Sequence, residues 1–179
     1  MPVPDFSPGE VLTAAAMDSI GLWLVKTQTI GTGVSSVEVT GAFSSNYDNY
    51  LITVSGGSSS TSTDMRMRLG AATTGYYSFL IYGNYTAATV LGFQSANAAQ
   101  WGFNGSCSPN NLDAQINIKS PFLSRRTNYF ANHSYADTTT GYYQSGGYLD
   151  NATSYTAFTL FPATGTMTGG TIRVYGYRN

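Results

Sequence analysis

The stretch "MRMRLG", residues 65–70, alternates apolar and charged side chains one by one. In an extended strand, successive side chains point to opposite faces, so the two methionines and Leu69 would share one face and the two arginines the other. The stretch "AQINIK", residues 114–119, repeats the pattern with Ala and Ile alternating with Gln, Asn and Lys. Alternation of this kind predicts half-buried β-strands with one face on a core and one toward solvent.

The rest of the chain after residue 21 has the same character. Segments rich in β-branched and aromatic residues are separated by clusters of Gly, Ser, Thr and Asn, as expected of strands and turns. Their spacing predicts about nine to eleven short strands and negligible helix. We therefore expect an all-β fold, an antiparallel β-sandwich that resembles a jelly roll. The clearest strand segments are residues 21–30, 34–43, 49–57, 65–70, 76–82, 114–122, 128–135, 154–161 and 170–177.

A short helical pattern precedes these strands in "SPGEVLTAAAMDSIG", residues 7–21. Ser7 suits the N-cap, Pro8 suits the first helical position, and Glu10 completes a capping box with Ser7. Gly21 is placed to end the helix. The sequence therefore predicts a short N-terminal α-helix of about twelve residues, which is marginal when isolated in water.

Such a helix needs a partner, and we expect that partner to lie outside its own chain. The prediction divides the chain into an N-terminal attachment arm with the short helix, residues 1–20, and a β-sandwich domain, residues 21–179. In an assembly, the apolar residues of the arm could bury one another between copies of the chain or dock on another surface. The candidate assembly residues are Phe6, Val11, Leu12, Ala15 and Ile20.

The composition restricts the partners. Only 9% of the residues are charged and the formal net charge is −1, whereas roughly a quarter of the residues of an ordinary soluble protein are charged. A surface with so little charge resists self-association poorly unless much of it is buried in an assembly. The charge balance gives no electrostatic attraction to nucleic acid, and no apolar run approaches the length of a membrane span. We therefore expect self-association, no nucleic acid and no membrane insertion.

Few residues could carry chemistry. Cys107 and His133 are each the single residue of their type, which excludes a zinc site built from several cysteines or histidines. No nucleotide-binding motif or nucleophile elbow occurs. A pair of carboxylates for glycoside hydrolysis stays open among nine acidic residues, although most of them sit in turn-like contexts. We expect no cofactor, no metal and no enzymatic activity.

Aromatic side chains near predicted turns suggest binding. Tyrosines among Asn, Ser and Gly form adaptable recognition surfaces, with flat apolar faces and hydroxyl or amide hydrogen bonds. Sugar rings would suit such a surface. The alternative is that these rings fill the sandwich core or a subunit interface. The candidate glycan-binding residues are Tyr76, Tyr77, Trp101, Tyr142 and Tyr143.

Three segments carry a resemblance to a known group of proteins. They are "FSPGEVLTAAAMDSIGLWLVKTQTIG" at residues 6–31, "VSSVEVTGAFSSNYDNYLITVSG" at 34–56 and "GTMTGGTIRVYGYRN" at 165–179. They resemble segments of virion structural proteins of tailed bacteriophages, of the small β-rich minor tail, fibre or decoration type. The resemblance covers the first third of the chain and its last fifteen or so residues. It implies a homotrimer that is anchored through its N-terminal segment and displays the β-domain outward.

Three functions follow from these observations. The leading expectation is a structural protein displayed on the virion, a homotrimeric fibre or tail-associated protein that adheres to host-surface glycan and contacts other virion proteins of capsid or tail. The second is a capsid decoration, or cement, protein, and the third is a free-standing carbohydrate-binding module. The first residues lack the basic and apolar segments of a secretion signal. We therefore expect assembly in the host cytoplasm and a final location in the virion.

Overall fold

The computed structural model describes residues 21–134 and 141–177. The predicted N-terminal helix lies outside these residues, as do Phe6, Val11, Leu12, Ala15 and Ile20. The described part of the chain contains β-strands and no helix, and each pair of neighbouring strands in it is antiparallel. The prediction of an all-β, antiparallel fold is therefore confirmed.

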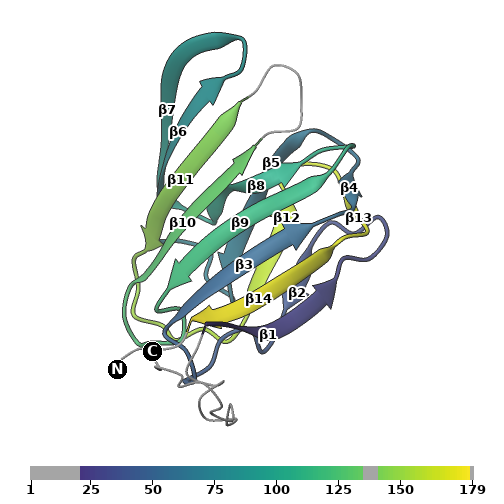
Figure 1. The fold of residues 1–179 in the computed structure, drawn as a ribbon. Helices are drawn as coiled ribbons and strands as arrows, with labels where there is room; N and C mark the ends of the chain where they lie inside the picture. Colours follow the sequence, from purple (N-terminus) through teal and green to yellow (C-terminus); the bar gives the residue numbers. More distant parts are fainter. Residues whose placement is uncertain (1–20, 135–140, 178–179) are drawn as a thin grey trace, which may run out of the picture.

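Eight strands form a front layer, in the spatial order β1-β14-β3-β9-β10-β11-β6-β7 (Figure 1). β7 lies at one edge of this layer and β1 at the other. The bounds, in that order, are β1 (Leu22–Thr29), β14 (Thr171–Tyr177), β3 (Asn49–Ser55), β9 (Leu112–Lys119), β10 (Thr127–Ser134), β11 (Tyr142–Leu149), β6 (Tyr76–Asn84) and β7 (Ala87–Ala98).

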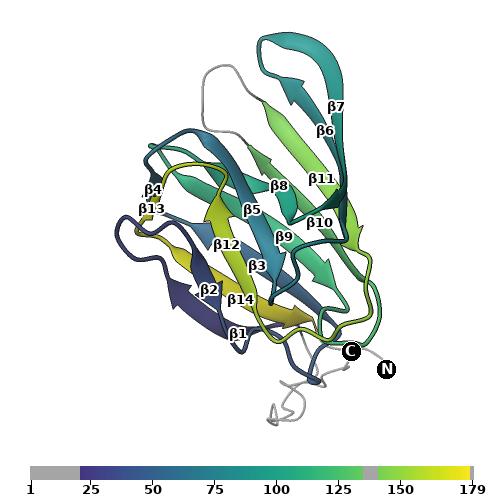
Figure 2. The same ribbon diagram turned by 180° about the vertical axis from the view of Figure 1, so that it is seen from behind.

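Four strands form a second layer behind the first, in the order β2-β12-β5-β8 (Figure 2). They are β2 (Val37–Val39), β12 (Phe158–Pro162), β5 (Thr63–Leu69) and β8 (Trp101–Cys107). A hairpin joins the layers, because β8 pairs with β9 only near the turn, at Ser106 and Cys107. A separate short pair, β4 (Ser58–Ser59) with β13 (Met167–Thr168), lies at one end of the molecule.

The core lies between the layers, and the alternation in the sequence accounts for it. In β5, Met65, Met67 and Leu69 are fully buried, while Arg66 and Arg68 are partly exposed. The same holds in β9, where the isoleucines are buried and the polar residues between them face outward. Burial of apolar side chains on both inner faces is the main favourable contribution to folding. The alternation therefore fixes which face of each layer points inward.

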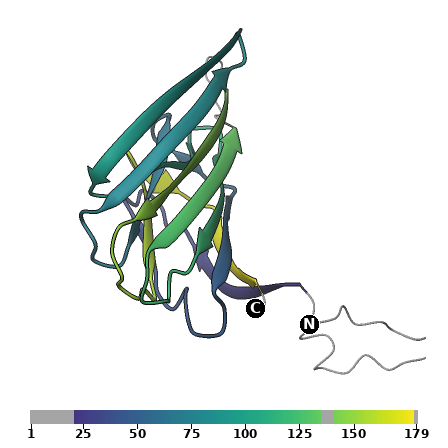
Figure 3. The same cartoon turned by 90° about the vertical axis from the view of Figure 1, so that its left-hand side faces the viewer.

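The front layer is longer than the layer behind it. The hairpin of β6 and β7 extends past the ends of the back strands (Figures 1 and 3). As a consequence, residues 87–94 of β7 are all exposed. This part of the front layer has solvent on both of its faces.

Candidate functional site

The outer face of the front layer carries a row of side-chain amides. Gln115 on β9 lies opposite Asn132 on β10, and Asn132 lies opposite Gln144 on β11. All three residues belong to the outward-facing set, since their sequence neighbours are buried. Directly opposed residues on adjacent antiparallel strands have Cβ atoms about 5 Å apart. The row therefore offers three neighbouring groups that each donate and accept hydrogen bonds.

Aromatic rings flank this amide row on both sides. Tyr142 precedes Gln144 by two residues and is 49% exposed. Phe130 precedes Asn132 by two residues and lies opposite Gly146, on the other side of the row. Both rings are on the outer face because side chains two positions apart in a strand point the same way. The amides are thus bordered by two exposed apolar rings.

A hollow of about 310 Å³ lies beside the amide row. Its lining residues are Asp113, Gln115, Asn132, His133, Ser134 and Tyr142. The Oδ1 atom of Asn132 is buried there and has no hydrogen-bond partner among the described residues. An acceptor in this state costs free energy unless a ligand or water satisfies it.

The one carboxyl group that lines this hollow, that of Asp113, is partly removed from water. Burial raises the pKa of Asp113, and a hydrogen bond from the backbone of Ser134 partly opposes that increase. Desolvation of this kind disfavours the charged form. The hollow therefore presents hydroxyl, amide and carboxyl groups, and Asp113 is the one acidic residue that lines it.

A second hollow of about 530 Å³ lies lower on the same face. It is lined by Asn49, Asn117, Ile118, Lys119, Phe130 and Tyr177. The Tyr177 hydroxyl donates a hydrogen bond of 2.6 Å to Oδ1 of Asn117. Phe130 borders both this hollow and the amide row, so the two form one continuous surface across the middle of the front layer.

A third hollow, of about 270 Å³, lies toward β7. The rings of Tyr77 and Tyr148 stack there with centroids 4.9 Å apart, and the Arg126 guanidinium lies over Tyr148 at 4.3 Å from the ring centre. Gly146 and Gly147 leave space between the strands, since a Cβ atom on Gly147 would lie 2.0 Å from the Tyr77 carbonyl oxygen. Gly147 in β11 is therefore needed for this close approach to β6.

The predicted glycan-binding residues divide into two groups. Tyr76 and Trp101 are fully buried in the core, where their rings pack edge to face at 5.1 Å. This corrects the expectation for these two residues, because a side chain without exposed surface cannot contact a glycan. Tyr143 is also buried, stacked between Tyr82 and His133.

The other two predicted residues reach the surface. Tyr77 and Tyr142 lie on the outer face, in the third and first hollows respectively. The amide row of Gln115, Asn132 and Gln144 was not among the residues predicted from the sequence. The signal was present in β9 and β10, where amides alternate with buried residues in the same way as the arginines of β5.

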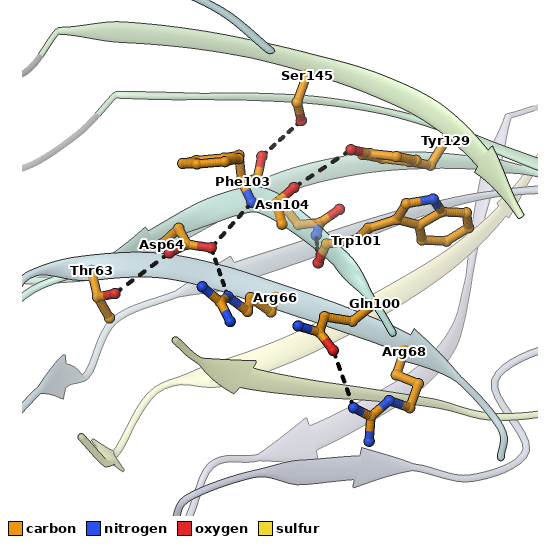
Figure 4. A network of polar contacts seen from close by, with 11 residues as sticks. Thr63, Asp64, Arg66, Arg68, Gln100, Trp101, Phe103, Asn104, Tyr129 and Ser145 are labelled. Atoms are coloured by element: carbon orange, nitrogen blue, oxygen red, sulfur yellow. Dashed lines mark hydrogen bonds and ion pairs between the residues drawn. The ribbon is translucent and has the colours of Figure 1, made fainter. Parts of the chain in front are cut away.

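A polar network lies between the layers around β8 (Figure 4). Oδ2 of Asp64 accepts hydrogen bonds from Nε of Arg66 at 3.0 Å and from the backbone N–H of Phe103 at 3.4 Å. Ser145 on β11 donates to the Phe103 carbonyl at 2.7 Å. Phe103 has a positive φ of 58°, a conformation in which few non-glycine residues occur. The network therefore holds an irregular β8 against both layers.

Two titratable side chains near this network, Cys107 and His133, are buried and uncharged at neutral pH. Burial raises the pKa of the Cys107 thiol to about 12, and Asp64 adds to the increase. Burial lowers the pKa of His133 to about 4, although Asp64 opposes that shift. A protonated thiol is a poor nucleophile, so the arrangement suits a structural role. Among residues 21–134 and 141–177, no group of three or more His, Cys, Asp or Glu is placed to hold a metal ion, and no helix has the length and hydropathy to cross a membrane.

Fold and site together define an antiparallel all-β protein with an amide and aromatic surface on its larger sheet. No protein-family model matches the chain, and no curated protein matches it. Among solved structures, it is similar to the crystal structure of infectious bursal disease virus VP2 subviral particle, at 13% identity and a TM-score of 0.16. That alignment covers 100% of this chain and 46% of the VP2 chain.

Proposed function

We propose that this protein is a structural protein displayed on the virion of a tailed bacteriophage, and that the outer face of its front layer binds neutral glycans of the host surface. The observation that carries the glycan part is the amide row of Gln115, Asn132 and Gln144 between two exposed aromatic rings. The resemblance of residues 6–31, 34–56 and 165–179 to phage virion proteins supports the virion part.

The chemistry of the face matches carbohydrate rather than a charged ligand. Sugar hydroxyls both donate and accept hydrogen bonds, as do side-chain amides. The C–H faces of sugar rings are apolar and can cover the exposed rings of Tyr142 and Phe130. The charged groups nearby, Asp113 and Lys119, carry opposite formal signs. A neutral oligosaccharide therefore meets complementary hydrogen-bonding and apolar groups on this face.

The rest of the expected organisation belongs to the same proposal. It comprises a jelly-roll-like sandwich, a homotrimer and an attachment arm at residues 1–20 that contacts other virion proteins. In this arrangement the arm anchors the protein and the sandwich faces outward. The number of copies per purified particle separates a fibre or tail position from capsid decoration, because a decoration protein covers the shell in many more copies.

Binding to an array of neutral bacterial-surface glycans tests the glycan part. We expect Tyr142→Ala to weaken binding about tenfold, the loss of one aromatic contact worth ~1.4 kcal/mol. Tyr85→Ala is the matched control, since Tyr85 is 63% exposed but lies outside the three hollows. It should bind as the unmodified protein does.

Three results would contradict the proposal. One is the absence of binding to any neutral glycan by the unmodified protein. Another is equal binding by the Tyr142 and Tyr85 variants. The third is release of shorter oligosaccharides from a bound polysaccharide, which would show enzymatic cleavage instead of adhesion.

A further inference from the structure

β7 forms a free edge of the front layer and is its longest strand, at twelve residues (Figure 3). Its exposed apolar side chains include Val90 at 74% and Phe93 at 54%. At about 3.3 Å per residue, the strand offers roughly 40 Å of edge. A long, apolar and unpaired edge is a template for pairing with another strand.

The free edges at β1 and β2 are protected against such pairing. β1, at the opposite edge of the front layer, carries Lys26 and an irregular register between Leu24 and Lys26. β2, at the free edge of the back layer, is three residues long and exposes Glu38. Lysines, irregularities and short strands are the usual means of blocking edge association. The middle of β7 has none of them, since six consecutive residues pair with β6 in regular register.

The hairpin of β6 and β7 contains no charged side chain. No Asp, Glu, Lys or Arg occurs in residues 69–112, which include all of β6, β7 and β8. A charged partner strand would leave its charges unpaired against this surface, at a cost in free energy. The edge therefore fits a partner strand that is equally apolar and uncharged, and β7 itself has these properties.

Both faces of the β6–β7 hairpin also need covering. Phe79, Ile81 and Val90 are exposed on the outer face. Leu91 and Phe93 are exposed on the inner face, and the Phe93 ring also lies 5.7 Å from the ring of Phe103 in β8. A twofold axis perpendicular to the sheet brings like faces together, outer beside outer and inner beside inner. Such an axis can place Leu91 of one copy opposite Phe93 of the other.

We propose that two copies of this protein pair antiparallel along β7, so that their front layers form one continuous sheet. The contact is isologous and adds backbone hydrogen bonds along the free edge of β7, which pairs with no other strand among residues 21–134 and 141–177. The inference is independent of glycan binding and of the virion assignment. It also remains compatible with a separate threefold contact through another part of the chain.

Light scattering on the full chain tests the pairing. Val90→Lys places two lysines in the twofold contact, and we expect the dissociation constant to rise at least about tenfold. At protein concentrations between the dissociation constants of the unmodified protein and the variant, the measured mass should then fall toward half, whatever other contact the chain makes. Leu24→Lys is the matched control, since Leu24 is 56% exposed on the opposite edge of the same layer. Its mass should equal that of the unmodified protein.

Hydrogen exchange provides a second measurement and a check of folding. The backbone amides of β7 should be protected in the unmodified protein and in Leu24→Lys, and exchange faster in Val90→Lys. Protection in β3 and β9 should be the same in all three proteins. A mass that corresponds to one or three copies of the unmodified chain would overturn the proposal, as would a Val90→Lys variant of unchanged mass. Glycan binding by Val90→Lys should be retained, so this proposal can fail without the other.

Discussion

Two adjacent glycines in β11 show how strongly single residues are constrained by the sheet. Gly146 and Gly147 occupy the strand beside the amide row. A Cβ atom on Gly147 would lie 2.0 Å from the Tyr77 carbonyl oxygen, whereas one on Gly146 would lie 3.4 Å from its nearest neighbour, the Tyr129 carbonyl oxygen. The first distance is a clash with backbone and the second is ordinary van der Waals contact.

Replacing each glycine by alanine should therefore have different effects. We expect Gly147→Ala to lower the free energy of unfolding by about 2–3 kcal/mol, because β11 and β6 must separate to admit the methyl group. Gly146→Ala should be neutral or stabilising by up to about 1 kcal/mol, since alanine restricts the unfolded chain. Urea unfolding measures both. Similar stabilities for the two variants would show that the strands are not held this closely.

At the scale of strands, the sequence predicted those with clear alternation and missed those without it. β5 and β9 were predicted from alternating side chains, and both have the expected buried face. β7, β8 and β11 were not singled out. β8 and β11 each contain two glycines, and β7 is exposed on both faces, so none of the three strands alternates apolar and polar residues regularly along its sequence. Pairing with neighbouring strands determines these three, and a local pattern does not contain that information.

The same reasoning explains why only some of the predicted glycan-binding residues lie on the surface. The surface residues Tyr77 and Tyr142 could be proposed from composition alone. Tyr76 and Trp101 occur in sequence segments of similar composition, but their side chains face inward and are buried. Only the register of β6 and β8 separates the two groups, because a shift of one residue moves a side chain to the opposite face.

The conformation of β8 depends on the Asp64 carboxylate, which accepts a hydrogen bond from the Phe103 backbone. Two Asp→Ala variants test this dependence. Asp64 is nearly buried and accepts hydrogen bonds from Arg66 and Phe103, so we expect Asp64→Ala to cost about 2 kcal/mol of unfolding free energy. Asp150→Ala is the control. Its ion pair with Arg126 is about half exposed, and such pairs contribute between about 0 and 1 kcal/mol.

Denaturant unfolding of both variants, with hydrogen exchange at β8, provides the measurement. The Asp64 variant should also exchange faster at Phe103 than the unmodified protein. Equal stability of the two variants would mean that the carboxylate does not hold β8 in place.

At the scale of the whole molecule, the stability should depend on pH through His133. Burial lowers the pKa of this residue to about 4 in the folded protein, while an unfolded histidine has a pKa of about 6.5. Between these values the unfolded chain binds a proton that the folded protein does not. Stability is therefore present in full above about pH 6.5 and falls as the pH falls toward 4, by on the order of 3 kcal/mol.

His133→Leu should remove this decrease. The raised pKa of Asp113 acts in the opposite sense at acidic pH, because there the folded protein binds the proton more strongly than the unfolded chain. For that reason, the quantity to compare is the difference in slope between the variant and the unmodified protein, from urea unfolding at several pH values between 4 and 7. Parallel slopes would show that His133 titrates normally in the folded state.

The burial of Cys107 has a practical consequence. The chain has a single cysteine, and its thiol is buried and protonated near neutral pH. A maleimide or other thiol reagent will leave it unmodified until the layers separate. The native residue can thus report on opening of the whole protein, and a second cysteine placed on the surface can carry a spectroscopic label without any change to the first.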